Sequence, residues 1–169
     1  MIAYIDNPNP TAAAKNLHYT IELYSPTNSV IAKKEGWVDL PPAATVPVFV
    51  PDFFSGSAEV ARAFLTFDAP QHLWFRTTYS PVLPRIEDSS LEESNTPRII
   101  VRAMNPTATA MKEVSFIVTV FDGEGNAMAA SKTIAPSIPA QGSARLIFTW
   151  PTPFASTVAR IEVLPVVLL

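Results

Sequence analysis

The sequence NPTATA at residues 105–110, followed by VSFIVTVF at residues 114–121, repeats an earlier part of the chain. The earlier copy is NPTAAA at residues 9–14, followed by LHYTIELY at residues 17–24. A period of about 100 residues is the size of a whole β-sandwich domain, whereas solenoid and propeller repeats span about 20–50 residues. The repeat therefore predicts two similar small domains in tandem.

The repeat continues beyond these stretches with small changes of offset. Asn9 matches Asn105 at an offset of 96 residues, and Leu23 matches Val120 at an offset of 97. Residues 60–62 and 158–160 both read VAR, at an offset of 98. Similar proline-containing turns lie between them, LPPAAT at 40–45 and IPAQGS at 138–143. We interpret this drift as one ancestral unit with small loop changes. No polar constellation recurs in both copies, so the duplicated feature is a scaffold.

Alternation of apolar and polar residues predicts antiparallel strands, as in the first copy, where Leu17, Tyr19, Ile21 and Leu23 share one face. The chain has seventeen prolines against five glycines, which leaves little room for long helices. We therefore expect an all-β fold made of two tandem antiparallel immunoglobulin- or fibronectin-III-like β-sandwiches, each with about seven strands. The predicted domains are residues 1–83 and 97–169, joined by an acidic linker at 84–96.

The composition excludes several functional classes. The net charge of −3 and the absence of a basic stripe argue against nucleic acid as a partner. The chain has no cysteine, which excludes disulfides and thiolate metal sites. No apolar run approaches the roughly 20 residues of a membrane span, and no signal peptide is visible. We expect no membrane span in this chain, and an anchor encoded upstream is compatible with such an N-terminus.

VTVFD at residues 118–122, followed by Gly125 and by the turn at 138–143, resembles the strand-turn core of FxLYD-like and LEA14 (WHy)-like domains. The first copy departs from this pattern, because Tyr24-Ser25-Pro26 replaces the aromatic-Asp pair and Asn28 stands where Gly125 stands. The resemblance implies small immunoglobulin- or fibronectin-III-like sandwiches. It also implies an extracytoplasmic or membrane-anchored place in bacteria and the absence of catalytic residues.

Residues that carry catalytic or metal chemistry are sparse. His18 shares a strand face with Glu22 but has no further donor nearby, and His72 lies in an irregular stretch. The acidic residues at 87, 88, 92 and 93 lack the glycine and the ligand spacing of a calcium loop. There is no Gly-x-Ser-x-Gly elbow and no phosphate-binding loop. We predict no enzyme activity, no cofactor and no metal site.

Aromatic residues are the remaining candidates for function. Phe53 and Phe54 follow a proline in a predicted loop, and with Trp74 they form the predicted contact surface. Trp37 aligns with Ile134 of the second copy, which we interpret as a core position, so we expect Trp37 to pack in the core or between the domains.

Two functional hypotheses follow from these residues. The first is a non-catalytic structural or protein-interaction module of the bacterial cell envelope. The alternative is a carbohydrate- or small-ligand-binding module that uses the aromatic loops, or a stress-protective protein of the LEA14 type. A cytoplasmic place stays open.

Two apolar parts of the sequence predict buried side chains that the alternation of the strands does not account for. The chain end at 163–169 is almost wholly apolar, so we expect it to pair with a strand of the second domain or with a partner, and a homodimer is one way to cover it. Ile117 lies on the polar face of its strand, which predicts that this face is partly covered in the second domain.

Overall fold

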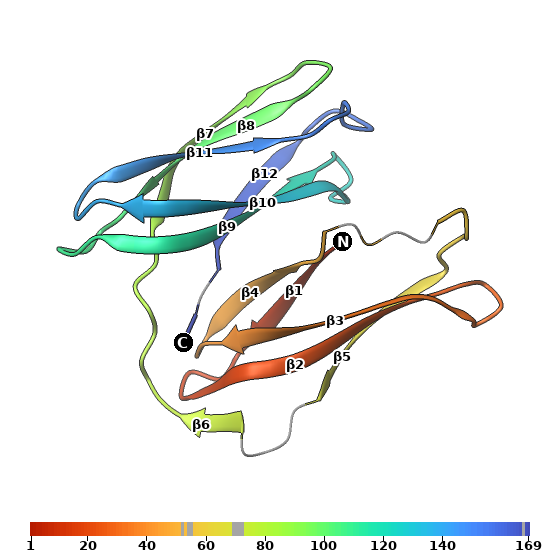
Figure 1. The fold of residues 1–169 in the computed structure, drawn as a ribbon, viewed down its shortest axis with the longest axis horizontal. Coiled ribbons are helices and arrows are strands. Elements are labelled where there is room, and N and C mark those ends of the chain that lie inside the picture. The colour runs from red at the N-terminus through yellow and green to blue at the C-terminus, as the bar shows by residue number, and fades with distance from the viewer. Residues whose placement is uncertain (52, 54–55, 69–72, 167) are drawn as a thin grey trace. The chain divides into compact units, whose positions relative to one another are not determined.

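The computed structural model describes residues 1–51, 53, 56–68, 73–166 and 168–169. Twelve β-strands and no α-helix occur among these residues (Figure 1). The pairings within the three- and four-stranded sheets are antiparallel. The prediction of an all-β fold built as antiparallel β-sandwiches is confirmed.

The chain divides into two compact units, one containing residues 3–81 and the other residues 82–166. In unit 1, β2 is the central strand of the sheet β3-β2-β5 and also pairs with β6, while β1 and β4 form a second sheet. The strands are β1 (Ile2–Asn7), β2 (Ala12–Tyr24), β3 (Val30–Leu40), β4 (Ala44–Phe49), β5 (Arg62–Asp68) and β6 (Trp74–Arg76).

Unit 2 contains two three-stranded sheets, β10-β9-β12 and β11-β8-β7. Its strands are β7 (Arg85–Glu92), β8 (Arg98–Met104), β9 (Met111–Phe121), β10 (Ala127–Ile138), β11 (Ser143–Thr149) and β12 (Arg160–Pro165). Phe116 and Val118 of β9 face Val101 of β8 and Phe148 of β11 across a core that is closed to solvent. Because each strand alternates, these inward residues bury one face of each sheet.

The first part of the chain end and Ile117 follow the sequence predictions, whereas Leu168 near the end of the chain is 77% exposed. Val163 and Leu164 pair with β9 of the same unit, opposite Val118 and Ile117. Ile117 is 4% exposed. A homodimer stays a prediction.

The predicted acidic linker at residues 84–96 is wrong, because most of it forms the edge strand β7. Ile86 and Leu91 pack against the core of unit 2, and Ile86 lies opposite Ala103 in the pairing with β8. A bulge between Ile86 and Asp88 inserts an extra residue. The bulge interrupts the alternation of apolar and polar residues, so the inward residues Ile86 and Leu91 are five positions apart. Without that alternation, the sequence pattern is typical of a polar loop.

The repeat match at Asn9 is also wrong by two residues, since Asn7 is the counterpart of Asn105. The Asn7 side-chain amide donates to Pro41 O at 2.8 Å, and that of Asn105 donates to Pro139 O at 3.1 Å. Both pairs are 34 residues apart. Asn7 is 4% exposed and Asn105 is 0% exposed. The structural offset is therefore 98 residues at this motif and at the proline turn alike.

Hairpin turns begin at Ser25 in unit 1 and at Asp122 in unit 2, and they differ in one titratable group. Asp122 Oδ1 accepts hydrogen bonds from the amides of Asn126 at 2.8 Å and Glu124 at 2.9 Å. In unit 1 the hydroxyl of Ser25 accepts from the amide of Ser29 at 3.1 Å. The bond from the Asn126 amide is the main cause that lowers the pKa of Asp122.

We expect the Asp122 turn to loosen in acid. Because the folded state lowers the pKa of Asp122, its contribution is complete above the unfolded value of about 3.9 and is lost as the pH falls through the lower, folded value. An NMR titration should show the Asn126 amide shifting below about pH 4. The amide of Ser29 is the matched control, since the Ser25 hydroxyl does not titrate. Equal shifts at both amides would contradict the assignment.

Candidate functional site

The predicted contact surface of Phe53, Phe54 and Trp74 is only partly described. Phe53 is half-buried and packs against the core of unit 1. Trp74 is 39% exposed on β6, and Phe54 lies outside the described residues. Phe154 in unit 2, which also follows a strand and a proline, likewise packs against its own core. A joint surface of the three aromatics therefore stays a prediction, and Phe53 serves the core.

A second aromatic surface lies on the outward face of the sheet β3-β2-β5. Tyr19, Ile21 and Leu23 of β2 are buried, so the residues between them point outward. The pairing places Trp37 opposite His18 and Phe64 opposite Glu22. We call this surface the aromatic face and define it by four residues: His18, Tyr24, Trp37 and Phe64.

Trp37 and His18 form one end of the aromatic face. Trp37 is 68% exposed, so its interpretation as a core position is wrong; its counterpart Ile134 is also exposed, at 55%. The ring centroids of His18 and Trp37 are 5.3 Å apart with an interplanar angle of 54°. His18 Nε2 lies 3.7 Å from Glu35 Oε2. The charged neighbour of His18 is therefore Glu35 on β3, rather than Glu22 on its own strand.

Tyr24 and Phe64 form the other end. Their ring centroids are 5.5 Å apart and their planes meet at 88°, an edge-to-face contact. The Tyr24 hydroxyl donates to Glu22 Oε2 at 2.9 Å. This hydrogen bond is the main cause that raises the pKa of Tyr24. Phe64 is 47% exposed on β5.

Charges of both signs lie among these rings. Lys33 Nζ is 2.7 Å from Glu35 Oε1, and this contact raises the pKa of Lys33 and lowers that of Glu35. Both side chains are about half exposed, so the pair adds little to stability. The aromatic face therefore carries exposed aromatic rings, a residue type enriched in protein–protein interfaces, beside charged side chains of both signs.

The aromatic face is specific to unit 1. In unit 2, Ile134 and Ser115 occupy the positions of Trp37 and His18. The Tyr24 position is taken by Phe121, whose ring lies 3.7 Å below the guanidinium of Arg160. The two copies thus share the scaffold and differ in what their outward faces present.

Within the described ranges, no group of three or more His, Cys, Asp or Glu side chains is placed to hold a metal ion. The same residues include no helix with the length and apolar character to cross a membrane.

Comparisons with known proteins add little to this description. No family model matches the sequence, and no curated protein matches it. Among solved structures, the chain is similar to a β-glucuronidase from glycoside hydrolase family 2, with 6% sequence identity and a TM-score of 0.28. The match covers 88% of this chain and 19% of that chain, so this chain spans about a fifth of the enzyme. Nothing about activity follows from a similarity of this level, and the FxLYD-like or LEA14-like resemblance stays a prediction.

Proposed function

We propose that this protein is a non-catalytic interaction module that binds another protein through the aromatic face. The observation that carries the proposal is the exposure of Trp37, at 68%, and Phe64, at 47%, on one side of one sheet. Large aromatic side chains cost free energy when they face water, and they supply most of the binding energy where they become buried in an interface. A place in the bacterial cell envelope, outside the cytoplasm, is part of the proposal.

Ring geometry favours a protein partner over a carbohydrate. A sugar chain stacks on aromatic rings that lie flat against it. Tyr24 and Phe64 meet at 88° and His18 and Trp37 at 54°, so neither pair offers a coplanar platform. The charged Lys33 and Glu35 between the pairs suit complementary charges on a protein surface.

The double variant Trp37→Ala/Phe64→Ala should lose binding to this partner. Each anchor lost from the centre of an interface costs about 2 kcal/mol, so we expect recovery to fall at least about tenfold. The measurement is quantitative mass spectrometry of proteins captured from extracts of the producing cells. Ile134→Ala is the matched control, because Ile134 occupies the position of Trp37 in unit 2 and is similarly exposed.

The outcomes separate the two functional classes. Loss of a protein partner in the double variant, with retention in Ile134→Ala, supports the proposal. Retardation of the native chain by a polysaccharide in affinity electrophoresis, abolished in the double variant, would replace it with carbohydrate binding. Equal capture of the partner by the native chain, the double variant and Ile134→Ala would overturn the proposal.

A further inference from the structure

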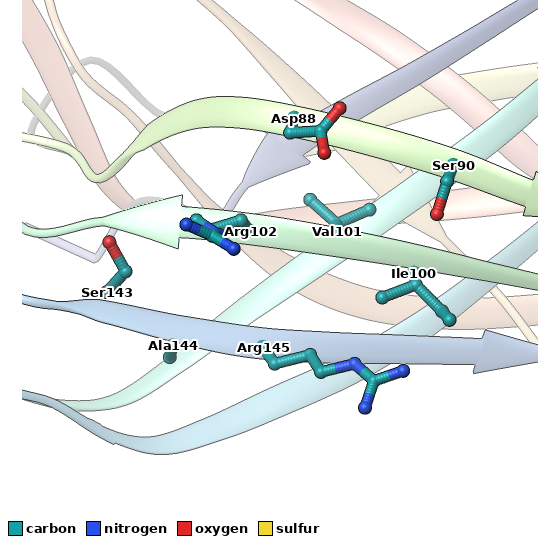
Figure 2. Close-up of a pocket in the computed structure, with 8 residues that line it drawn as sticks. All are labelled: Asp88, Ser90, Ile100, Val101, Arg102, Ser143, Ala144 and Arg145. Atoms are coloured by element: carbon teal, nitrogen blue, oxygen red, sulfur yellow. The ribbon is translucent and has the colours of Figure 1, made fainter.

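The outward face of the sheet β11-β8-β7 in unit 2 carries a shallow groove of about 290 Å³ (Figure 2). Arg102 of β8 lies at its centre, directly opposite Arg145 of β11 on one side and Asp88 of β7 on the other. One step along the sheet, Ile100 lies opposite Ile147 and Ser90. The groove therefore combines a charged row with an adjacent row of Ser90 and Ile100, and Ile147 continues that row beyond the groove lining.

The two arginines form a like-charge pair, and with the single carboxylate of Asp88 opposite Arg102 the row keeps a net positive charge. Residues directly opposite in antiparallel strands have Cβ atoms about 5 Å apart, where like charges destabilise the sheet. Among the described residues, neither Arg102 nor Arg145 has an ion-pair partner within 4.0 Å. On the same face, Arg98 is paired with Glu92 at 3.2 Å. Figure 2 shows the Arg145 side chain extended along β11, with its guanidinium directed away from Ser143.

The apolar row supplies a second type of contact. Ile147 is 44% exposed and Ile100 is half-buried, so both present aliphatic surface to a ligand. Ile100 and Arg102 are two residues apart on β8, which corresponds to about 6.6 Å along a strand. An extended peptide lying along β8 has the same spacing between alternate side chains.

We propose that this groove binds an extended acidic segment of a partner protein. A carboxylate of that segment lies between Arg102 and Arg145, and an apolar side chain two residues away packs on Ile100 and Ile147. Charge complementarity selects the carboxylate, because arginine pairs with carboxylates through parallel hydrogen bonds. The site goes beyond the aromatic face, which belongs to unit 1, and does not depend on it.

Acidic side chains at the edge of the groove limit the ligand to one or a few carboxylates. Asp88 lies beside Arg102, and Glu87 Oε2 accepts a hydrogen bond from Ser143 Oγ at 3.1 Å at the end of the groove. A polyanion such as nucleic acid would place further negative charge against both carboxylates. A short segment with one apolar and one acidic residue, separated by one residue, avoids this repulsion.

The test is an NMR titration of the full-length, ¹⁵N-labelled chain with a blocked hexapeptide, Thr-Val-Thr-Glu-Thr-Ser. We expect shifts centred on the amides of Ile100, Arg102 and Arg145. Arg102→Gln/Arg145→Gln should weaken binding about tenfold, because two charge-assisted contacts are lost. Asp88→Asn should strengthen binding about two- to threefold, since it removes a like charge beside the ligand. A purely structural role for Asp88 would not produce that gain.

Two controls test whether binding depends on the arginines of the groove and on the carboxylate of the peptide. Arg98→Gln removes a charge from the same face, outside the groove, and should change the dissociation constant less than about twofold. A peptide with Gln in place of Glu should bind about tenfold more weakly. Equal binding of the two peptides, shifts outside the groove, or a loss in Arg98→Gln equal to that of the double variant would each overturn the proposal. Displacement of the peptide by an equal concentration of inorganic phosphate would also overturn it, by indicating a simple anion site.

Discussion

Replacement of Asn105 by alanine is expected to lower the free energy of unfolding of unit 2 by about 3 kcal/mol. The Asn105 side chain is fully buried, and its amide donates to the carbonyl oxygens of Thr109 at 2.7 Å, Ile138 at 3.2 Å and Pro139 at 3.1 Å. Its Oδ1 accepts from the amide and the hydroxyl of Thr107, at 2.9 and 2.7 Å. Alanine leaves several of these groups without a partner, and each buried unsatisfied group costs about 1–3 kcal/mol.

Chemical denaturation, followed by NMR signals assigned to each unit, measures this effect. Asn7→Ala should destabilise unit 1 in a similar way, because its amide binds the carbonyls of Ala12 and Pro41, both at 2.8 Å. Asn9→Ala is the matched control, because Asn9 is exposed and, within the described part of the chain, its Oδ1 accepts hydrogen bonds only from Thr11. We therefore expect a cost below about 1 kcal/mol. Similar losses in Asn7→Ala and Asn9→Ala would contradict the corrected alignment of the repeat.

The correct alignment of the two copies, with Asn7 matched to Asn105, could be predicted from the sequence. NPT at residues 9–11 matches NPT at 105–107 letter for letter, whereas Asn7-Pro8-Asn9 matches less well. The hydrogen bonds define a different alignment. In each unit, the asparagine side-chain amide donates to the carbonyl of the proline that lies 34 residues later in the sequence. The proline turns at 40–45 and 138–143 already had an offset of 98, so anchoring the alignment there would have identified Asn7 from the sequence.

Two other differences between the sequence predictions and the structure, at β7 and at Trp37, have local physical causes. The sequence pattern does not predict the strand β7, because its bulge puts Ile86 and Leu91 on one face despite their odd spacing. Trp37 was placed in the core by comparison with Ile134, although it shares its strand phase with the charged Lys33 and Glu35. That phase predicts an outward side chain, which is the orientation found. The groove around Arg102 could not be predicted without the register of three strands, because its residues come from separate parts of the chain.

Gly36→Ala is expected to destabilise unit 1 by about 2–3 kcal/mol. Gly36 lies opposite Tyr19 in the pairing of β2 and β3, and a Cβ atom at Gly36 would overlap the Tyr19 hydroxyl oxygen and lie 2.5 Å from its Cζ. Tyr19 is only 8% exposed and belongs to the core cluster, so its ring cannot move away without opening the core. The ring therefore packs directly on the backbone of a residue that has no side chain.

A double-mutant cycle with Tyr19→Leu isolates this contact. Leucine removes the atoms that a Cβ would meet, so Gly36→Ala should cost less than about 1 kcal/mol in that background. Gly123→Ala is the matched control, because a Cβ there meets nothing within 4 Å, and we expect a change within about 0.5 kcal/mol. Unit 2 places Thr133 opposite Phe116 at the corresponding position, so the scaffold itself accepts a side chain there. If Gly36→Ala cost the same with and without Tyr19, the requirement for glycine would come from the backbone rather than from the ring.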